Sequence, residues 1–391
     1  MPKRARWLLL VGLLVLLSGF AGGYAARQLI MPKPNVGFSL VQEAYGLLEA
    51  HFMEPLPPGS VLEHGMIRGM LEAVGDPYTL FLEPASHELL SDTLAGEYGG
   101  IGVVLTRDQA GRLHLVPSPG GPAALAGIVE GDVLLAIDGQ PVGRQAPAET
   151  VGAALRGLVG TTVHLRIAGR APSQGALLFE IVRQSILLPT VVGYVSPDWP
   201  DVGVLVISGF SERTHGELSG AYDSLIQRQV QRLVVDLRGN PGGLLDAGVA
   251  VARFFLESGV VVIEQTRGQA DAAHRASEPG PACTIPLAVV VDRSTASAAE
   301  IVAGALQDNH RAPLVGEATY GKSSVQLIFE LQDGSSIHVT SARWLTPSGR
   351  RLDGIGLDPD LVVRLEEAAP DQDLALEAAI GWLLAADGPS P

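Results

Sequence analysis

The chain has very little cysteine, little lysine and no excess of positive charge, and each shortage narrows the possible functions. Cys283 is the one cysteine among 391 residues, which excludes an internal disulfide framework and a zinc site built from several cysteines. The formal net charge is −15. Because binding to phosphates needs a basic face, this charge argues against nucleic acid as a partner.

Lysine is the second shortage. Of 27 lysine and arginine residues, only Lys3, Lys33 and Lys322 are lysine, so Lys322 stands alone in the main body of the chain. Arginine keeps its proton in a protein, whereas a buried lysine can lose its proton and act as a base. The alternative is that one lysine survives by chance in an arginine-biased composition. The residues around Lys322 decide whether it is a catalytic base or a lysine retained by chance.

The N-terminus predicts a location. Lys3, Arg4 and Arg6 precede an almost uncharged run over residues 7–26, which is long enough to cross a bilayer as a helix. Positive charge before such a run indicates that the rest of the chain leaves the cytoplasm. We therefore expect a cytoplasmic tail at 1–6, a single-pass anchor at 7–26 and an extracytoplasmic body. A cleaved signal peptide is the competing interpretation.

The body of the chain is predicted to be a multidomain α+β protein. Residues 36–95 have helical apolar spacing and form an N-terminal helical region for packing or for a possible homodimer. Residues 96–186 change to short strands with glycine-rich turns. Residues 187–365 mix helices with the continuous apolar runs 233–237 and 287–291, which are typical of strands covered on both faces. Residues 366–391 hold a last amphipathic helix and the tail.

The second region resembles a PDZ domain over nearly its whole length. The resemblance is carried by the glycine-rich start of a strand at 99–103 and by the helix, turn and strand pattern of 122–139. It implies that an extended peptide adds as a strand beside the expected strand 101–105, opposite a helix near 149–156. The peptide carboxylate would lie at the glycine-rich loop around residues 100–102. The peptide-binding residues would be Gly100, Ile101, Gly102 and Val103. The alternative is a module that only packs against its neighbours.

Residues 316–323 match the phosphate-loop pattern G-x-x-x-x-G-K-S. Such a loop must lead into a helix whose N-terminus helps to hold the phosphate. After Lys322, however, apolar residues alternate, and Asp333-Gly334 then provides a turn. The pattern predicts a β-hairpin and argues against a nucleotide site. The alternating residues are Val325, Leu327, Phe329 and Leu331.

Ser297 lies at a predicted turn from a strand to a helix over 298–308. With Glu300 it forms a capping box, and most such serines only cap. The same position would also suit a nucleophile, because the N–H of Ala298 and the helix N-terminus can stabilise an oxyanion. Gly242 and Gly243 follow another strand and could add a second N–H, or could form only a tight turn. His310 lies past the far end of the helix, which leaves Lys322 as the candidate base.

Together, the segments 236–243, 294–300 and 316–323 resemble the carboxyl-terminal processing peptidases, also called tail-specific proteases. The likeness extends to 69–78 and 343–350. The resemblance implies a mixed α/β protease core in which Ser297 is the nucleophile, Lys322 the general base and Gln326 the residue that orients the base. It implies an oxyanion hole from Ala298 and the turn at Gly242 and Gly243, without deciding between the two glycines.

Two departures from the family pattern leave this assignment unchanged. Ala299 replaces a serine that is common in the family motif, and Ser323-Ser324 replaces the usual Gly-Thr or Gly-Ser. Ser294 and Ser324 remain weaker rival nucleophiles.

We therefore predict a membrane-anchored serine endopeptidase that binds accessible C-terminal tails of proteins through a PDZ domain and cleaves near them. The predicted chemistry uses no metal and no organic cofactor. A non-catalytic PDZ-containing scaffold is the alternative, and a phosphate-loop nucleotide binder is a weaker one.

Overall fold

The computed structural model describes residues 37–171, 173–364 and 372–386. The chain divides into a small unit that ends at Gly65 and a large unit that begins at Met66. The expected membrane anchor at 7–26 lies outside the described residues. Within the described ranges, no helix has both the length and the apolar character needed to cross a membrane.

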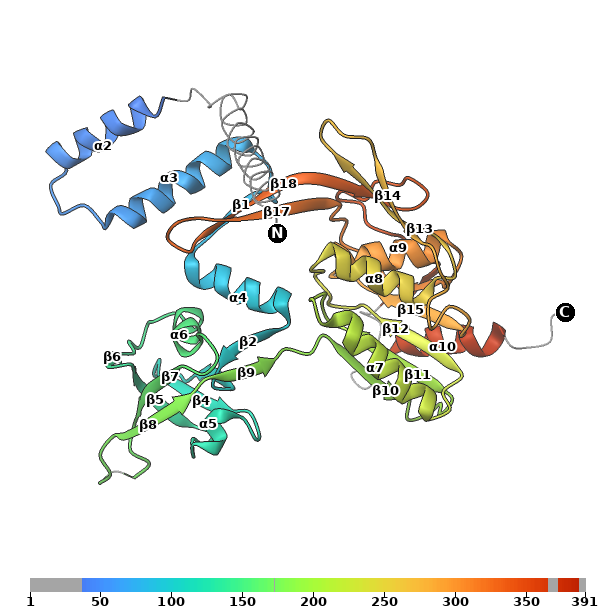
Figure 1. Cartoon of the computed structure of the whole chain (residues 1–391), viewed down its shortest axis with the longest axis horizontal. Helices are drawn as coiled ribbons and strands as arrows, with labels where there is room; N and C mark the ends of the chain where they lie inside the picture. Colours follow the sequence, from blue (N-terminus) through green and yellow to red (C-terminus); the bar gives the residue numbers. More distant parts are fainter. Residues whose placement is uncertain (1–36, 172, 365–371, 387–391) are drawn as a thin grey trace, which may run out of the picture. The chain divides into compact units, whose positions relative to one another are not determined.

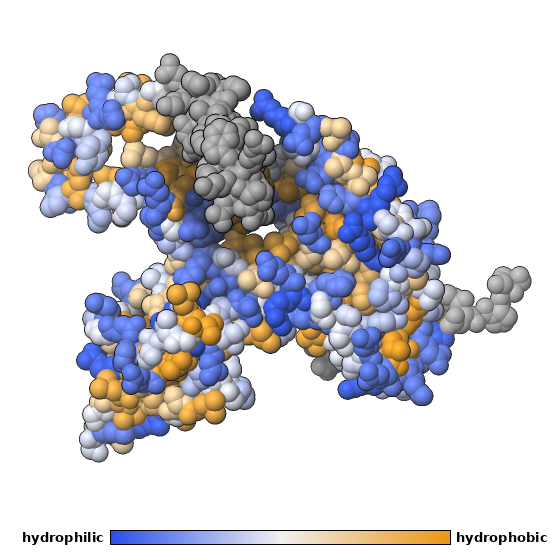
Figure 2. Space-filling view, in the orientation of Figure 1, coloured by the Kyte–Doolittle hydropathy of each residue, from blue (hydrophilic) through white to orange (hydrophobic). Residues whose placement is uncertain are grey.

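The small unit holds α2 (Ser39–His51) and the first turns of α3 (Gly59–Val74). Both helices were predicted from their apolar spacing. Neither helix has a buried residue, and Figure 2 shows hydrophobic side chains on their outer surface. Leu40 is 77% exposed and Met53 is 95% exposed, so these two apolar side chains lie open to solvent.

The helical prediction for 36–95 is wrong at one element. After α3 the chain forms the short strand β1 (Leu80–Leu82) before α4 (Pro84–Ala95). Gly75 adopts a φ of +73°, and Pro77 disfavours helical backbone at Asp76, so α3 cannot continue. Strand β1 then pairs with β18 (Ser336–Leu345), far along the chain. This long-range pairing is not visible in local sequence spacing.

The PDZ-like region is a small sheet with two helices (Figure 1). Its strands run in the order β3-β4-β5-β7-β8, with the short β6 paired to β5, and β2 pairs separately with β9. Strand β3 pairs only with β4, so its other edge is open in the described structure. The elements are β2 (Glu97–Gly100), β3 (Val103–Arg107), β4 (Leu113–Pro117), α5 (Pro122–Leu125), β5 (Asp132–Ile137), β6 (Gln140–Pro141), α6 (Ala148–Leu155), β7 (Thr162–Ile167), β8 (Leu177–Val182) and β9 (Gln184–Leu187).

The third region is built on a six-stranded sheet in the order β10-β11-β12-β15-β16-β19. Strand β10 is antiparallel to β11, and the other neighbours are parallel. Alternate residues of its strands pack with α7, α8 and α9 on one face and with α10 on the other. The elements are β10 (Val191–Val195), β11 (Val202–Ile207), α7 (Thr214–Gln227), β12 (Arg232–Asp236), α8 (Leu245–Phe255), β15 (Leu287–Val291), α9 (Ala298–Asp308), β16 (Leu314–Gly316), β19 (Leu361–Val362) and α10 (Leu374–Ala386).

This arrangement confirms the buried strands predicted at 233–237 and 287–291. Every residue of β15 is buried, as expected of a strand with helices on both faces.

A second sheet holds the predicted hairpin. Strand β17 (Ser324–Glu330) pairs antiparallel with β18, and β18 also pairs with β1 and β13. The sheet is completed by β13 (Gly259–Thr266) and β14 (Ala272–Ala276). Because a strand and not a helix follows Lys322, the phosphate-loop interpretation lacks the helix N-terminus that it requires.

Candidate active site

Three motifs from the sequence meet at one edge of the six-stranded sheet. The segment 236–243 follows β12, the segment 294–300 follows β15, and the segment 316–323 follows β16. These three strands are parallel and adjacent. The carboxyl ends of adjacent parallel strands lie at the same edge, which is the usual place for a site in an open α/β sheet.

Ser297 has a strained backbone at the start of α9. Its φ of 55° and ψ of −118° are unusual for a residue with a side chain, and such a conformation costs roughly 1–3 kcal/mol. The serine is partly exposed, while Ala296 and Ala298 on either side are buried. Its backbone N–H donates to a carboxylate oxygen of Glu300 at 2.9 Å. The predicted N-cap position is thus confirmed, and its strain is typical of a functional residue.

The turn after β12 is held by Asn240, which is fully buried. Its side-chain amide donates to the carbonyl oxygen of Ile207 at 2.7 Å, and its side-chain oxygen accepts the N–H of Gly242 at 2.8 Å. Its backbone oxygen accepts the N–H of Ala296 at 2.9 Å. Asn240 therefore joins the glycine turn to the residue just before Ser297.

Gly242 and Gly243 differ in whether their backbone N–H groups are already hydrogen-bonded. A Cβ at Gly242 would lie 2.7 Å from the Cβ of Ser297, so only glycine fits there. The N–H of Gly242 is already bonded to Asn240. Within the described chain no acceptor is bonded to the N–H of Gly243 or of Ala298. The geometry therefore favours Gly243 over Gly242 as a donor to an oxyanion.

Lys322 is partly buried, and its amine lies near two other side chains. The Nζ atom is 3.5 Å from the side-chain oxygen of Gln326 and 5.3 Å from the centre of the Tyr78 ring. Burial lowers the pKa of the Lys322 amine from its usual value, because a low-dielectric environment disfavours the ammonium form. No hydrogen bond joins Nζ to the Ser297 hydroxyl in this structure.

Glu300 is the functional residue whose role the sequence did not reveal. Its carboxylate is fully buried and accepts four hydrogen bonds. One oxygen accepts the backbone N–H groups of both Ser297 and Lys322, at 2.9 and 2.8 Å. The other oxygen accepts the Thr319 hydroxyl and the Gly321 N–H, at 2.6 and 2.7 Å. The two candidate catalytic residues thus share one acceptor atom.

We expect the Glu300→Ala variant to lose about 3 kcal/mol or more of unfolding free energy, because it leaves several buried donors without an acceptor. Glu300→Gln keeps one oxygen, so its unfolding free energy should lie between those of Glu300→Ala and the wild type. Urea unfolding of the full chain at one pH measures both changes. A Glu300→Ala variant as stable as the wild type would contradict the conclusion that the Glu300 carboxylate holds the Ser297 and Lys322 segments together.

The Lys322 segment is also tied to residues that follow β18. Thr319 and Leu357 exchange two hydrogen bonds, and the N–H of Gly354 donates to the carbonyl of Gly321 at 2.9 Å. A Cβ at Gly321 would meet the Leu352 carbonyl at 2.4 Å. The candidate base is therefore positioned by Glu300 on one side and by residues 352–357 on the other.

The rival serines are placed less well. Ser294 is exposed, and its N–H belongs to the turn around Asp292. Ser324 lies two residues past Lys322 at the start of β17 and is 7% exposed, with no hydrogen-bond partner for its hydroxyl in the described structure. Only Ser297 combines partial exposure with unbonded amides beside it.

The residues expected to bind a peptide lie where β2 turns into β3. Gly102 has a φ of +68°, and its carbonyl accepts the N–H of Ser118 at 2.8 Å. Val103 begins β3, the open edge strand. Ile101 is 1% exposed and belongs to the PDZ-like core, and Gly100 and Gly102 are buried as well. The expected strand 101–105 therefore begins two residues later than predicted.

A strained serine at a helix N-terminus, with unbonded amides beside it, is the chemistry of a serine hydrolase. The sequence profile of Peptidase family S41 matches residues 201–363, and that of the PDZ domain matches residues 115–169.

Known proteins give the family. A carboxyl-terminal-processing protease of Picosynechococcus sp. is 36% identical over 323 residues, with 80% of this chain and 77% of that protein covered. The carboxy-terminal processing protease CtpA of Bacillus subtilis is 31% identical over 334 residues, with 85% and 70% covered. A solved structure from Bacteroides fragilis, assigned to the S41 proteases, has the same fold, with a TM-score of 0.50, 17% identity, and 85% and 93% of the two chains covered.

The chain belongs to peptidase family S41, among the carboxyl-terminal processing proteases, and is a serine-type peptidase with a PDZ domain. The resemblance predicted from its motifs is confirmed.

Proposed function

We propose that this protein is an extracytoplasmic endopeptidase that holds the C-terminal tail of a protein in its PDZ domain and cleaves near that tail with Ser297 and Lys322. The observation that carries the proposal is the shared acceptor. One oxygen of Glu300 accepts the backbone N–H of both Ser297 and Lys322. The backbone nitrogens of the two residues therefore lie close together.

The proposed reaction begins with a neutral Lys322 amine. The amine takes the proton of the Ser297 hydroxyl while Oγ attacks the scissile carbonyl carbon. The carbonyl oxygen becomes an oxyanion that accepts the N–H groups of Gly243 and Ala298. The ammonium then gives its proton to the leaving amine, and the peptide bond breaks. Water, deprotonated by the same amine, cleaves the acyl-enzyme and restores the Ser297 hydroxyl.

The amine must approach the hydroxyl for this reaction to begin. Catalytic hydrogen bonds are often loose without substrate and tighten in the complex. A lysine side chain is long and flexible, so we expect it to carry Nζ from Gln326 toward Ser297 when substrate binds.

The PDZ domain should recognise a free carboxylate. Gly100 to Gly102 precede the open edge of β3, where a peptide can add as a strand and its terminus can meet backbone N–H groups. We expect a peptide with a free C-terminus to bind at least about tenfold more tightly than its C-terminal amide, since charge-assisted hydrogen bonds are lost. Fluorescence anisotropy with the uncleaving Ser297→Ala variant measures both affinities, and equal affinities would contradict carboxylate capture.

Location and assembly belong to the same proposal. The basic residues before the apolar run 7–26 favour a single-pass anchor in the cell membrane with the catalytic part outside the cytoplasm. The exposed apolar side chains of α2 and α3 favour packing against a second copy. They include Leu40, Leu47 and Leu48 of α2 and Met66 and Met70 of α3.

The direct test is cleavage of a protein that carries a tagged C-terminal tail. We expect the full chain to release tail fragments that mass spectrometry can identify, and to spare the same protein when its tail ends in an amide. Binding of the tail without any cleavage would support the alternative of a non-catalytic scaffold.

A further inference from the structure

The loop between α3 and β1 contacts the candidate base, although it lies more than 200 residues before it in the sequence. The ring of Tyr78 faces the Lys322 amine, with 5.3 Å between Nζ and the ring centre. The side-chain amide of Gln326 donates to the backbone carbonyl of Tyr78. One residue of this loop therefore contacts both side chains to which the base chemistry is assigned.

The Tyr78 carbonyl determines how Gln326 is turned. A carbonyl oxygen only accepts hydrogen bonds, so it must face the NH₂ group of the glutamine. The glutamine oxygen then faces Lys322, where it lies 3.5 Å from Nζ. An amine can donate in both its charged and its neutral form, so this orientation suits every stage of the reaction. Without the Tyr78 carbonyl, either end of the amide could face Lys322.

The loop is fixed by hydrogen bonds and not by close packing on both sides. The Asp76 carboxylate accepts the Thr79 hydroxyl at 2.6 Å and the Tyr78 N–H at 3.3 Å. The Thr79 hydroxyl oxygen accepts the N–H of Thr340, whose strand partner is Gln326. The loop is thus attached to the strand pair that carries Gln326.

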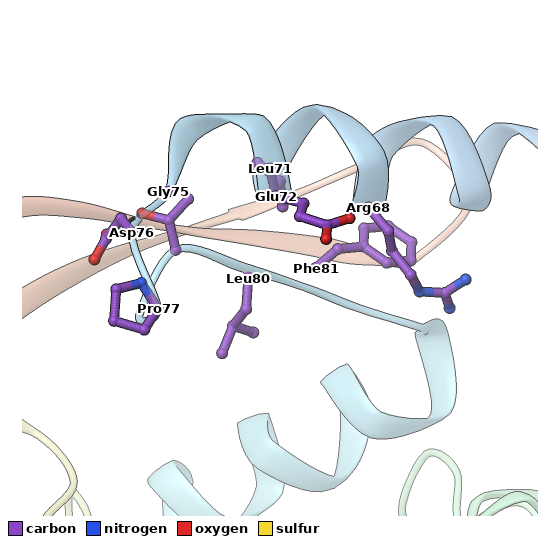
Figure 3. Close-up of a pocket in the computed structure, with 9 residues that line it drawn as sticks. Arg68, Leu71, Glu72, Gly75, Asp76, Pro77, Leu80 and Phe81 are labelled. Atoms are coloured by element: carbon purple, nitrogen blue, oxygen red, sulfur yellow. Dashed lines mark hydrogen bonds between the residues drawn. The ribbon is translucent and has the colours of Figure 1, made fainter.

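An open pocket of about 460 Å³ lies against the same loop, between it and the end of α3 (Figure 3). Figure 3 shows Asp76 and Pro77 of the loop, with Leu71 and Glu72 of α3 beside the pocket. The bonds of Asp76 and Thr79, together with that from Gln326, therefore help to hold Tyr78 in place.

We propose that Tyr78 is a positioning residue for the base, which orients Gln326 through its carbonyl and holds the Lys322 ammonium against its ring. This inference rests on the proposed function of Lys322. A ring face attracts an ammonium but not a neutral amine. Tyr78 therefore stabilises the charged form of the base between proton transfers and keeps the amine beside Gln326.

Other titratable groups lie around the amine and stay the same in every variant below. His338 on β18 is 4% exposed and interacts electrostatically with both Lys322 and His87 of α4. Glu300 on α9 bonds the Lys322 backbone. Tyr320 and Asp353 act on the Tyr78 hydroxyl. Because none of these is changed, a difference between two Tyr78 variants reports the ring.

The test compares Tyr78→Leu with Tyr78→Phe in the full chain. Leucine keeps the carbonyl and an apolar cover over the amine but removes the ring face, whereas phenylalanine keeps the ring and removes only the hydroxyl. Lysine labelled with ¹³C at Cε gives few signals, because the chain has three lysines. The Lys322 signal, assigned by its loss in Lys322→Met, then reports the titration of the amine without any need for cleavage.

We expect the titration of Lys322 in Tyr78→Leu to move to lower pH by about half a unit to one unit, since the ammonium loses its ring contact. At a pH where the amine is neutral in both chains, its kcat should fall by up to about tenfold with KM within about twofold, because the ring no longer stabilises the ammonium that forms as Ser297 attacks. The acid side of its pH–rate profile should move to lower pH. Tyr78→Phe should match the wild type in all three measurements.

Either of two results would overturn the inference. The leucine variant could titrate and cleave like the wild type, which would leave Tyr78 as a packing residue. Alternatively, phenylalanine could fail as badly as leucine, which would assign the effect to the hydroxyl. A wild-type chain without Ser297-dependent cleavage would refute the proposed function instead, and the NMR titration would still decide whether the ring holds the amine.

Discussion

The Ser297→Ala variant is expected to lose at least about 10⁴-fold in kcat while it stays folded and still binds protein tails. Loss of a serine nucleophile typically leaves only the catalysis that the oxyanion donors and substrate binding provide. The backbone bond from residue 297 to Glu300 does not involve the hydroxyl, so alanine preserves it. Cleavage of a tagged tail gives the rate, and circular dichroism with peptide binding checks the fold.

The matched controls are the two rival serines. Ser294→Ala and Ser324→Ala should each cleave within about threefold of the wild type, because neither hydroxyl takes part in the proposed reaction. If Ser297→Ala kept more than about a hundredth of the activity while one of these variants lost it, the nucleophile would be misassigned.

The second large effect is expected from Lys322→Arg. A guanidinium keeps its proton throughout the accessible pH range, so it cannot accept the serine proton. We expect kcat/KM to fall by about 10³-fold or more, which is the range for loss of a general base that acts together with its nucleophile. The rate of tail cleavage, measured from pH 6 to pH 10, tests this, and full activity in Lys322→Arg would refute the base assignment.

The matched control is Lys322→Met, which removes the base and also removes the cost of burying an ammonium. Burial lowers the pKa of this amine in the folded chain. The unfolded chain therefore binds the extra proton more readily, and the amine opposes folding most strongly below its folded pKa. This penalty fades as the pH rises toward the ordinary lysine value. We expect Lys322→Met to be as inactive as Lys322→Arg and to melt higher than the wild type at neutral pH.

The lowered pKa of Lys322 also determines how the reaction rate depends on pH. As the pH falls through the lowered pKa of Lys322, the neutral amine disappears and cleavage should slow on the acid side.

Local patterns predicted the elements that carry the site. A capping box, buried strands and an Asp-Gly turn are short-range signals, so α9, β12, β15 and the β17–β18 hairpin follow from the sequence alone. The nucleophile and base candidates followed from the family motifs, which lie at the ends of these elements.

Long-range contacts explain what the sequence did not predict. Glu300 was interpreted only as part of a helix cap, because its partners at 319–322 lie 19 to 22 residues later. The choice between Gly242 and Gly243 depends on a side-chain bond to Asn240. Strand β1 and Tyr78 gain their roles from β17 and β18, more than 240 residues away, and no local spacing reveals such pairing.

The way Lys322 is anchored has a consequence for newly made chains. A ribosome releases Ser297 well before residues 352–357, yet Thr319 and Gly321 depend on that late segment for their hydrogen bonds. In a nascent chain that already includes Ser297, the Lys322 amine is therefore not yet held in position to activate the serine. We therefore expect cleavage to begin only after residues 352–357 have folded against the Lys322 segment.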